Sequence, residues 1–272
     1  MNTKKNNPKT VKIKKFESKV SQAIKKYNLI NNGDRIMIGI SGGKDSMSLL
    51  AALTSRKNYT KEKFEIIAIH IEIDNVPYEI DKDFIADFCK KNDVNFVVEK
   101  IHVDFEREPD KSKCFVCSWH RRKRLFELTA EHNCNKLALG HHLDDAIETL
   151  IINMCYHGSI SSMPASLKMF DGRIELIRPL ILLTNNEIKN FANQMEFPGE
   201  IQTCPYEDQT KRNQAAEIII EMEKRFKPAR KGIFNAMSKI HKEYLPVESG
   251  KNPIIEGLNL PHDKPKTKTE IN

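Results

Sequence analysis

The feature that most constrains the fold of this 272-residue chain is an alternation of short apolar runs with longer segments of helical composition. Five runs have the length of strands, namely residues 35–40, 64–73, 95–103, 136–140 and 173–180. The intervening segments with helical composition are residues 47–56, 81–91, 118–133 and 141–156. This order predicts an α/β fold, a doubly wound parallel five-stranded sheet whose ligands bind at the carboxyl ends of the strands.

Helical additions are expected at both ends of this alternating region. A helix is predicted over residues 20–27, and Thr184 with Glu187 forms a capping-box pattern that begins a helix ending near Met195. Residues 211–240 are predicted to be helical with a break near Pro228. We therefore expect four parts: a basic arm and helix (1–30), an α/β domain (31–200), a helical segment (201–245) and a flexible tail (246–272).

Composition narrows the class of protein. Apolar residues make up 39% and charged residues 30% of the chain. No apolar run approaches the ~20 residues that a membrane helix needs. The first fifteen residues hold six lysines and no acid, but no apolar stretch follows as in a secretory signal. We expect a cytoplasmic protein with no membrane partner. The net charge of +7 fits a solvated surface as well as it fits a nucleic-acid footprint.

A phosphate-binding turn is predicted where the first strand ends, in the sequence Ser41-Gly-Gly-Lys-Asp-Ser46. Gly42 and Gly43 allow backbone N–H groups to approach an anion, and the start of the next helix adds partial positive charge. The two serines and Lys44 can also contact a phosphate, whereas Asp45 fits a magnesium ligand or a helix cap better. The alternative is a tight turn that only connects a strand to a helix. The spacing is not that of a Walker A loop.

A second polar segment, Gly-His-His-Leu-Asp-Asp, follows the fourth strand at residues 140–145. Its acids, together with Glu148, can hold magnesium and bring it to a triphosphate. The alternative is that acids in a first helical turn only complement the helix dipole. That alternative does not account for the two adjoining histidines.

Cys114-x-x-Cys117 lies directly before the start of a predicted helix, and Cys204 lies about ninety residues further on. Two thiolates at this spacing can share a metal centre. A zinc site completed by His120, a redox pair and chance are the alternatives. The other three cysteines are expected to be small core residues: Cys89, Cys134 and Cys155.

Basic residues follow the cysteine pair, beginning with Arg121 and Arg122. A further basic series runs through the last predicted helices: Lys211, Arg212, Lys224, Arg225, Lys227, Arg230 and Lys231. Any single basic run is more often a solvated face than a binding site, but a position beside a candidate site favours phosphate contact. Trp119, the only tryptophan, either stacks on a base or packs against the protein.

Ser41–Ser46 matches the SGGxDS signature of PP-loop ATP pyrophosphatases, which cleave ATP to AMP and pyrophosphate. The segment ending in Asp144-Asp145 resembles a second signature shared by tRNA lysidine synthetases and tRNA thiolases. Together with the Cys-x-x-Cys, these motifs resemble the tRNA 2-thiocytidine biosynthesis family (TtcA) over most of the chain. The resemblance implies ATP and Mg2+ binding by Ser41, Gly42, Gly43, Lys44, Asp45, Ser46, Gly140 and His141, with Asp45, Asp144 and Asp145 as catalytic carboxylates.

The same resemblance implies a 4Fe-4S cluster held by Cys114, Cys117 and Cys204, with one iron open to bind sulfide. The family usually carries a second Cys-x-x-Cys near the third ligand, whereas only Cys204 is present here. Arg121 and Arg122 would contact the substrate, a tRNA thiolated at a cytidine of the anticodon loop. Further implied partners are a sulfur donor such as a cysteine desulfurase and a second copy of the chain in a homodimer.

Three other functions share parts of this pattern. A lysidine synthetase carries both nucleotide signatures but needs no Cys-x-x-Cys, so iron analysis separates it. A nucleotide-binding iron–sulfur sensor would bind ATP without releasing pyrophosphate. Thiolation of a small molecule would not depend on the charges of Arg121 and Arg122.

Overall fold

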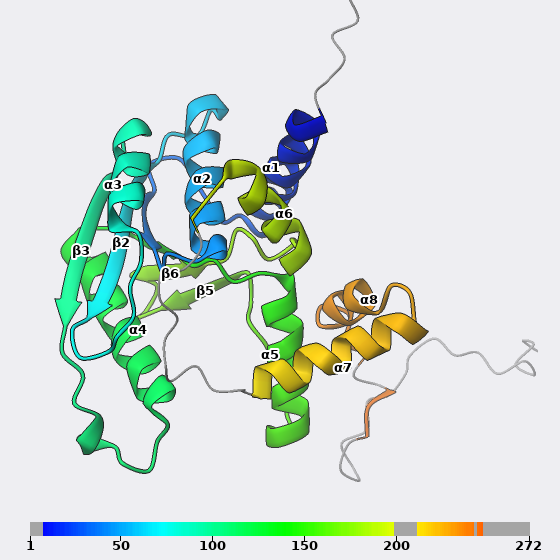
Figure 1. Cartoon of the computed structure of the whole chain (residues 1–272). Helices are drawn as coiled ribbons and strands as arrows, with labels where there is room; N and C mark the ends of the chain where they lie inside the picture. Colours follow the sequence, from blue (N-terminus) through cyan, green and yellow to red (C-terminus); the bar gives the residue numbers. More distant parts are fainter. Residues whose placement is uncertain (1–7, 199–210, 242–243, 247–272) are drawn as a thin grey trace, which may run out of the picture.

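A computed structural model describes residues 8–198, 211–241 and 244–246 (Figure 1). Its centre is a six-stranded sheet in the order β3-β2-β1-β4-β6-β5. The strands are β1 (Arg35–Gly39), β2 (Glu65–Ile73), β3 (Asn95–Ile101), β4 (Lys136–Ala138), β5 (Ser166–Met169) and β6 (Ile174–Ile177). Strand pairs β1–β2, β1–β4, β2–β3 and β4–β6 are parallel. The prediction of five parallel strands in a doubly wound sheet is confirmed.

The sixth strand, β5, was not predicted. It runs antiparallel to β6 at the edge of the sheet and is only four residues long. Its two central residues, Leu167 and Lys168, are exposed, so the segment lacks the apolar run that marks the other strands.

Helices cover both faces of the sheet (Figure 1). Their bounds are α1 (Pro8–Tyr27), α2 (Lys44–Tyr59), α3 (Lys82–Lys91), α4 (Lys113–Glu131), α5 (Leu143–His157), α6 (Asn185–Met195), α7 (Lys211–Arg225) and α8 (Ala229–Ala236), with a short 3-10 turn at Phe105–Arg107. The capping box of Thr184 and Glu187 is present at α6, and the helical region 211–240 is interrupted between α7 and α8 as predicted. Among the described residues, no helix is long and apolar enough to cross a membrane.

Two helix starts differ from the predictions by five residues or more. α1 begins at Pro8, twelve residues before the predicted start, and buries Phe16 and Val20 against the rest of the protein. α4 begins at Lys113, because the Ser112 hydroxyl accepts a hydrogen bond from the Phe115 amide and caps the helix there. The cysteine pair therefore lies inside the first turns of α4.

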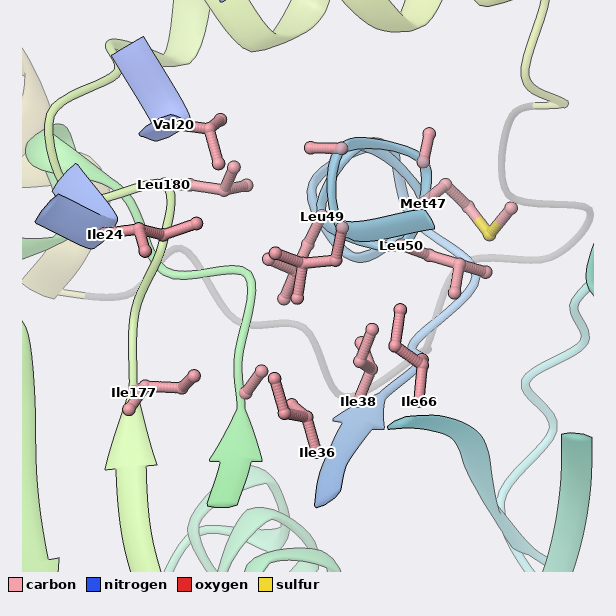
Figure 2. Packing of buried hydrophobic residues seen from close by; sticks show 14 of the residues in the cluster. Val20, Ile24, Ile36, Ile38, Met47, Leu49, Leu50, Ile66, Ile177 and Leu180 are labelled. Atoms are coloured by element: carbon pink, nitrogen blue, oxygen red, sulfur yellow. The ribbon is translucent and has the colours of Figure 1, made fainter. Parts of the chain in front are cut away.

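The core is divided by the sheet into two layers. Ile36 and Ile38 of β1 point into the larger layer with α1, α2 and α6, whereas Met37 between them packs against α4 on the other face. Period-two alternation of side chains along a strand produces this division. Figure 2 shows the larger layer, where residues of α2 lie over β1 and β2 beside residues of α1: Met47, Leu49, Leu50, Ile36, Ile38, Ile66, Val20 and Ile24.

Candidate active site

A cavity of about 270 Å³ opens where β1, β2 and β4 end. This is the edge at which a doubly wound sheet binds its ligands. Its lining combines both polar motifs, residues of β2 and two arginines: Gly39, Ile40, Ser41, Asp45, Ser46, Ile69, His70, Ile71, Arg121, Leu125, Leu139, Gly140, His141, Asp145 and Arg212. The structure therefore brings the two motifs, about a hundred residues apart, to one site.

Gly42 shapes the turn that precedes α2. Its φ is +83°, a left-handed conformation that favours glycine, and a Cβ at this position would stand 2.5 Å from Cγ2 of the buried Ile80. Gly43 then provides the cap residue of α2 without a side-chain hydrogen bond of its own. Backbone N–H groups at the start of α2 are thus left available for an anion, as the sequence predicts.

The two serines of the turn are hydrogen-bonded to it. The Ser41 amide donates to Oγ of Ser46 at 3.2 Å, and the Ser46 hydroxyl donates to the Gly43 carbonyl at 3.0 Å. The Tyr78 hydroxyl donates to the Ser41 carbonyl. These hydrogen bonds stabilise the conformation of the turn, and both serines line the cavity.

Gly140 allows the second motif to approach the first. A Cβ at Gly140 would lie 3.0 Å from the carbonyl carbon of Asp45 and 3.1 Å from the Ser46 nitrogen. The absence of a side chain therefore lets the β4–α5 connection pack directly against the first turn of α2.

The adjacent acids Asp144 and Asp145 have different surroundings. Asp145 lines the cavity, and its Oδ2 accepts the His142 amide at 2.8 Å. Asp144 is buried away from the cavity lining, where its carboxylate accepts from Nε of Arg230 at 2.5 Å and from the Asn185 amide at 2.7 Å. The structure thus brings Asp145, but not Asp144, together with the predicted phosphate-binding turn.

Asp45 and Asp145 face each other across His142. Nε2 of the buried His142 lies 3.8 Å from Oδ1 of Asp45 and 3.5 Å from Oδ2 of Asp145. Asp45 also pairs with Lys44 at 2.8 Å. Two carboxylates on one wall suit Mg2+ that takes its remaining ligands from phosphates and water. In the part of the chain that the structure describes, no three His, Cys, Asp or Glu side chains form a metal-binding group.

Burial changes the protonation of two residues near Asp145. It lowers the pKa of His141 to about 4, so this imidazole is neutral at pH 7. Burial, with the charge of Asp145 adding to it, raises the pKa of Glu148 to about 7. Nδ1 of His141 has no hydrogen-bond partner among the described residues. A neutral, buried ring nitrogen beside the cavity is suited to contact a ligand.

The cysteine pair shares a helix face with the cavity wall. Cys114, Cys117, Arg121 and Leu125 follow one another at intervals of three or four residues, which places them on one side of α4. Arg121 and Leu125 line the cavity. Cys117 precedes Arg121 by about 6 Å along the helix axis. Cys204, the predicted third ligand, lies outside the described residues.

The remaining cysteines correct one prediction. Cys89 and Cys134 are buried as expected, and burial raises the pKa of the Cys89 thiol to about 11. Cys155, also predicted to be a core residue, is exposed near the end of α5. Its neighbours Met154 and Tyr156 are exposed as well, although Tyr156 contacts Lys211 and Gln214 of α7.

The arginines around the cavity come from three elements. Arg121 lines the cavity and lies over the Tyr78 ring, whereas the neighbouring Arg122 is exposed outside the lining. Arg212 of α7 also lines the cavity, although the sequence indicated only a general basic surface there. Arg178, just after β6, is buried. Its position at the carboxyl end of an apolar strand was the feature of the sequence that could have indicated a place near the site.

The fold and the cavity define a nucleotide-binding PP-loop protein: a family model described as a PP-loop domain matches residues 12–220, so the chain belongs to this family. The curated relatives include proteins named tRNA-cytidine(32) 2-sulfurtransferase. The one from Geotalea daltonii is 33% identical over 239 residues, covering 85% of this chain and 94% of the relative. The one from Geotalea uraniireducens is 34% identical over 242 residues, covering 85% and 93%.

A solved structure has a similar fold. The U34-tRNA thiolase NcsA from Methanococcus maripaludis, determined with its 4Fe-4S cluster, matches with a TM-score of 0.67 at 22% identity. The match covers 85% of this chain and 79% of that protein. At this identity the likeness shows the shared fold.

Proposed function

We propose that this protein is an ATP-dependent tRNA sulfurtransferase that converts a cytidine of the anticodon loop to 2-thiocytidine. One observation carries the proposal: the cavity that holds the phosphate-binding turn is also lined by Arg121, which shares a face of α4 with Cys114 and Cys117. Nucleotide activation and sulfur chemistry would thus meet at one site. The names of relatives that match this chain over 85% of its length support the same substrate.

In this proposal the turn binds the phosphates of ATP. Backbone N–H groups of the turn and the hydroxyls of Ser41 and Ser46, which line the cavity, would contact the triphosphate. Lys44 lies outside the lining and is paired with Asp45, and its ammonium would add positive charge beside the phosphates. Mg2+ would lie between the triphosphate and the carboxylates of Asp45 and Asp145. Asp144 would support the site from behind through Arg230 and the Asn185 amide.

The first chemical step activates the base. The carbonyl oxygen at C2 of the cytidine attacks the α-phosphorus of ATP, the bond from that phosphorus to the bridging oxygen breaks, and pyrophosphate leaves. Positive charge from Lys44 and the amides at the start of α2 would stabilise the charge that develops on the phosphate. Sulfide then attacks C2 and AMP leaves with the original oxygen, so no net oxidation or reduction is required.

The cysteine pair fits an iron–sulfur cluster in donor chemistry and in position. Soft thiolates are the usual ligands of such clusters, and these two lie one helical turn apart on the face that leads to the cavity. With Cys204 they would provide three ligands. When bound, the cluster supplies an iron at which sulfide can be held for transfer. A cysteine desulfurase as sulfur source and a homodimeric assembly complete the proposal.

Anaerobic reconstitution with subsequent nucleoside mass spectrometry tests the proposal. We expect the protein with iron, sulfide, ATP and tRNA to form 2-thiocytidine, and Cys114→Ser to abolish thiolation while ATP still binds. Cys155→Ser, which changes an exposed cysteine of α5, is the matched control and should keep full activity. Full thiolation by Cys114→Ser, or ligation of lysine to the tRNA in place of sulfur, would contradict the proposal.

A further inference from the structure

Three arginines lie around the cavity without an equal number of carboxylates, and we refer to Arg121, Arg178 and Arg212 as the arginine cluster. Arg121 comes from α4, Arg178 follows β6 and Arg212 belongs to α7. Arg121 and Arg212 line the cavity together with His141 and Asp145. The charges of Arg178, Arg212 and the exposed Arg122 all act on His141, which places Arg178 and Arg212 on the same side of the site.

Arg178 carries a charge that the described residues do not neutralise. Its side chain is only 6% exposed, and its Nη1 donates to the Pro164 carbonyl at 2.6 Å. Its Nε has no hydrogen-bond partner, and it forms no ion pair within 4.0 Å among the described residues. Burial lowers its pKa to about 10, so the guanidinium remains protonated at neutral pH. An unpaired buried charge is costly, so an anion bound beside Arg178 would stabilise it.

The nearby acids do not balance the cluster. Asp45 is paired with Lys44, and Asp144 is paired with Arg230. Asp145 remains, with its Oδ1 4.0 Å from Nη1 of Arg212. Glu148 is charged only in part at pH 7, because its pKa is raised to about 7. The three arginines of the cluster, together with the exposed Arg122 whose charge acts on Arg178, therefore outnumber the nearby carboxylates of Asp145 and Glu148.

The phosphates of ATP already have their own donors in the turn and at the start of α2. The arginine cluster is supplied by other elements, including α4, on which the cysteine pair lies. We propose that the arginine cluster is a second phosphate subsite, which receives a phosphodiester group of the RNA beside the target base. This inference rests on the proposed function. Arg121 and Arg212 would contact the phosphate directly, and Arg178 would attract it from behind as a buried positioning charge.

Substitutions that remove one charge at a time test the subsite. We expect Arg212→Met and Arg178→Met each to raise the KM for tRNA about tenfold, equivalent to about 1.4 kcal/mol. Because each phosphate contact contributes ~0.7 to ~0.9 to the salt dependence of binding, the slope of log Kd for tRNA against log salt should fall by about that amount in Arg212→Met. The Kd for a non-hydrolysable ATP analogue should not change.

The matched control is Arg173→Met, at the amino end of the same strand, where an exposed arginine donates to the Phe170 carbonyl. It should leave both affinities unchanged. Arg178→Lys keeps the charge and should restore most of the tRNA affinity, which a purely structural role would not explain. If Arg178→Met does not fold, Arg212→Met, which changes an exposed residue, still tests whether the arginine cluster binds a phosphate of the RNA.

Two results would overturn the inference. If both variants weaken binding of the ATP analogue or of inorganic pyrophosphate while tRNA affinity stays constant, the cluster serves the triphosphate. If neither affinity changes, it is no phosphate subsite. Filter binding of tRNA measures affinity without turnover. A wild-type protein that binds tRNA with the predicted salt dependence but does not thiolate it would contradict the proposed function and leave the subsite standing.

Discussion

Nε of Arg230 in α8 lies 2.5 Å from Oδ1 of Asp144 in the first turn of α5. The same guanidinium contacts Glu223 of α7. Arg212 of α7 reaches the neighbouring carboxylate of Asp145. The two C-terminal helices are therefore joined by charged contacts to the helix start that forms one wall of the cavity.

Removal of the Arg230 charge should destabilise the protein. Arg230→Met leaves the Asp144 carboxylate buried, with the Asn185 amide as its hydrogen-bond donor and Nδ1 of His142 3.7 Å away among the described residues. The free energy of unfolding should therefore fall by roughly 3 kcal/mol, as measured by urea unfolding. The control is Lys231→Met, which changes an exposed neighbour on α8. It should lower the free energy of unfolding by less than about 0.5 kcal/mol. Replacing both members of the pair, as in Asp144→Leu/Arg230→Met, should recover much of the loss; no recovery would show that the ion pair is not the cause.

Glu148 should make stability depend on pH. Its folded pKa of about 7 exceeds the ordinary value of 4.5, so the folded protein binds this proton more tightly than the unfolded chain. The resulting stabilisation is present at low pH and is lost as pH rises through 4.5 to 7. The loss amounts to at most about 1.4 kcal/mol per pH unit.

Glu148→Gln removes this titration, so the stability of wild type relative to this variant should fall as pH rises from 4.5 to about 7. The comparison between variants is needed because the lowered pKa of His141 acts in the opposite direction. Glu217→Gln, on the exposed side of α7, is the control. Parallel stability curves for wild type and Glu148→Gln would show that Glu148 is not titrating in this range.

ATP binding should depend on the lack of space for a side chain at Gly42 more than on the backbone conformation of this residue. Gly42 has a φ of +83° and Gly33 a φ of +86°, but a Cβ meets Ile80 only at Gly42. Alanine at either position therefore faces a similar backbone strain of about 1–2 kcal/mol. Both variants should lower Tm, whereas only Gly42→Ala should weaken ATP binding, by tenfold or more as measured by isothermal calorimetry. The double variant Gly42→Ala/Ile80→Ala should regain part of the ATP affinity that Gly42→Ala loses. Equal ATP affinities for Gly42→Ala and Gly33→Ala would refute the packing argument.

Trp119 should contribute to RNA binding and little to stability. Its ring is 46% exposed on α4, with Lys123 over it at 5.7 Å and no core cluster around it. Stacking on an unpaired base contributes about 1–3 kcal/mol, so Trp119→Ala should raise the Kd for tRNA at least fivefold without a change in Tm. Tyr59→Ala, an exposed aromatic at the end of α2, provides the comparison. Unchanged tRNA affinity in Trp119→Ala would leave this ring without a role in binding.

The order of strands and helices could be predicted because β1, β2, β4 and β6 are largely buried in a sheet covered on both faces and appear as apolar runs. The edge strand β3 is half-exposed but still contains Phe-Val-Val at residues 96–98. β5 could not be predicted, since half of its residues are exposed at the edge of the sheet. The start of α4 was predicted five residues late, although Ser112 offered a cap signal.

The motifs that form the site could be predicted from the sequence, but not which of their side chains face the cavity. Asp144 and Asp145 are equivalent in sequence, and they differ in the structure because Arg230, 86 residues away, pairs with the first of them. The burial of Arg178 depends on the loop before β5, from which Pro164 supplies its carbonyl partner. Such contacts between distant segments have no local sequence signal.

The helical position of Cys114 and Cys117 also limits how the sequence can change during evolution. Each residue inserted into an α-helix rotates the part before the insertion by about 100° relative to the part after it. The segment before Ser112 can gain or lose residues without changing the direction in which the thiols point. Between Cys117 and Arg121, a single inserted residue would turn the thiols by about 100° away from the cavity wall, whereas an insertion of seven residues would bring them back to within about 20°.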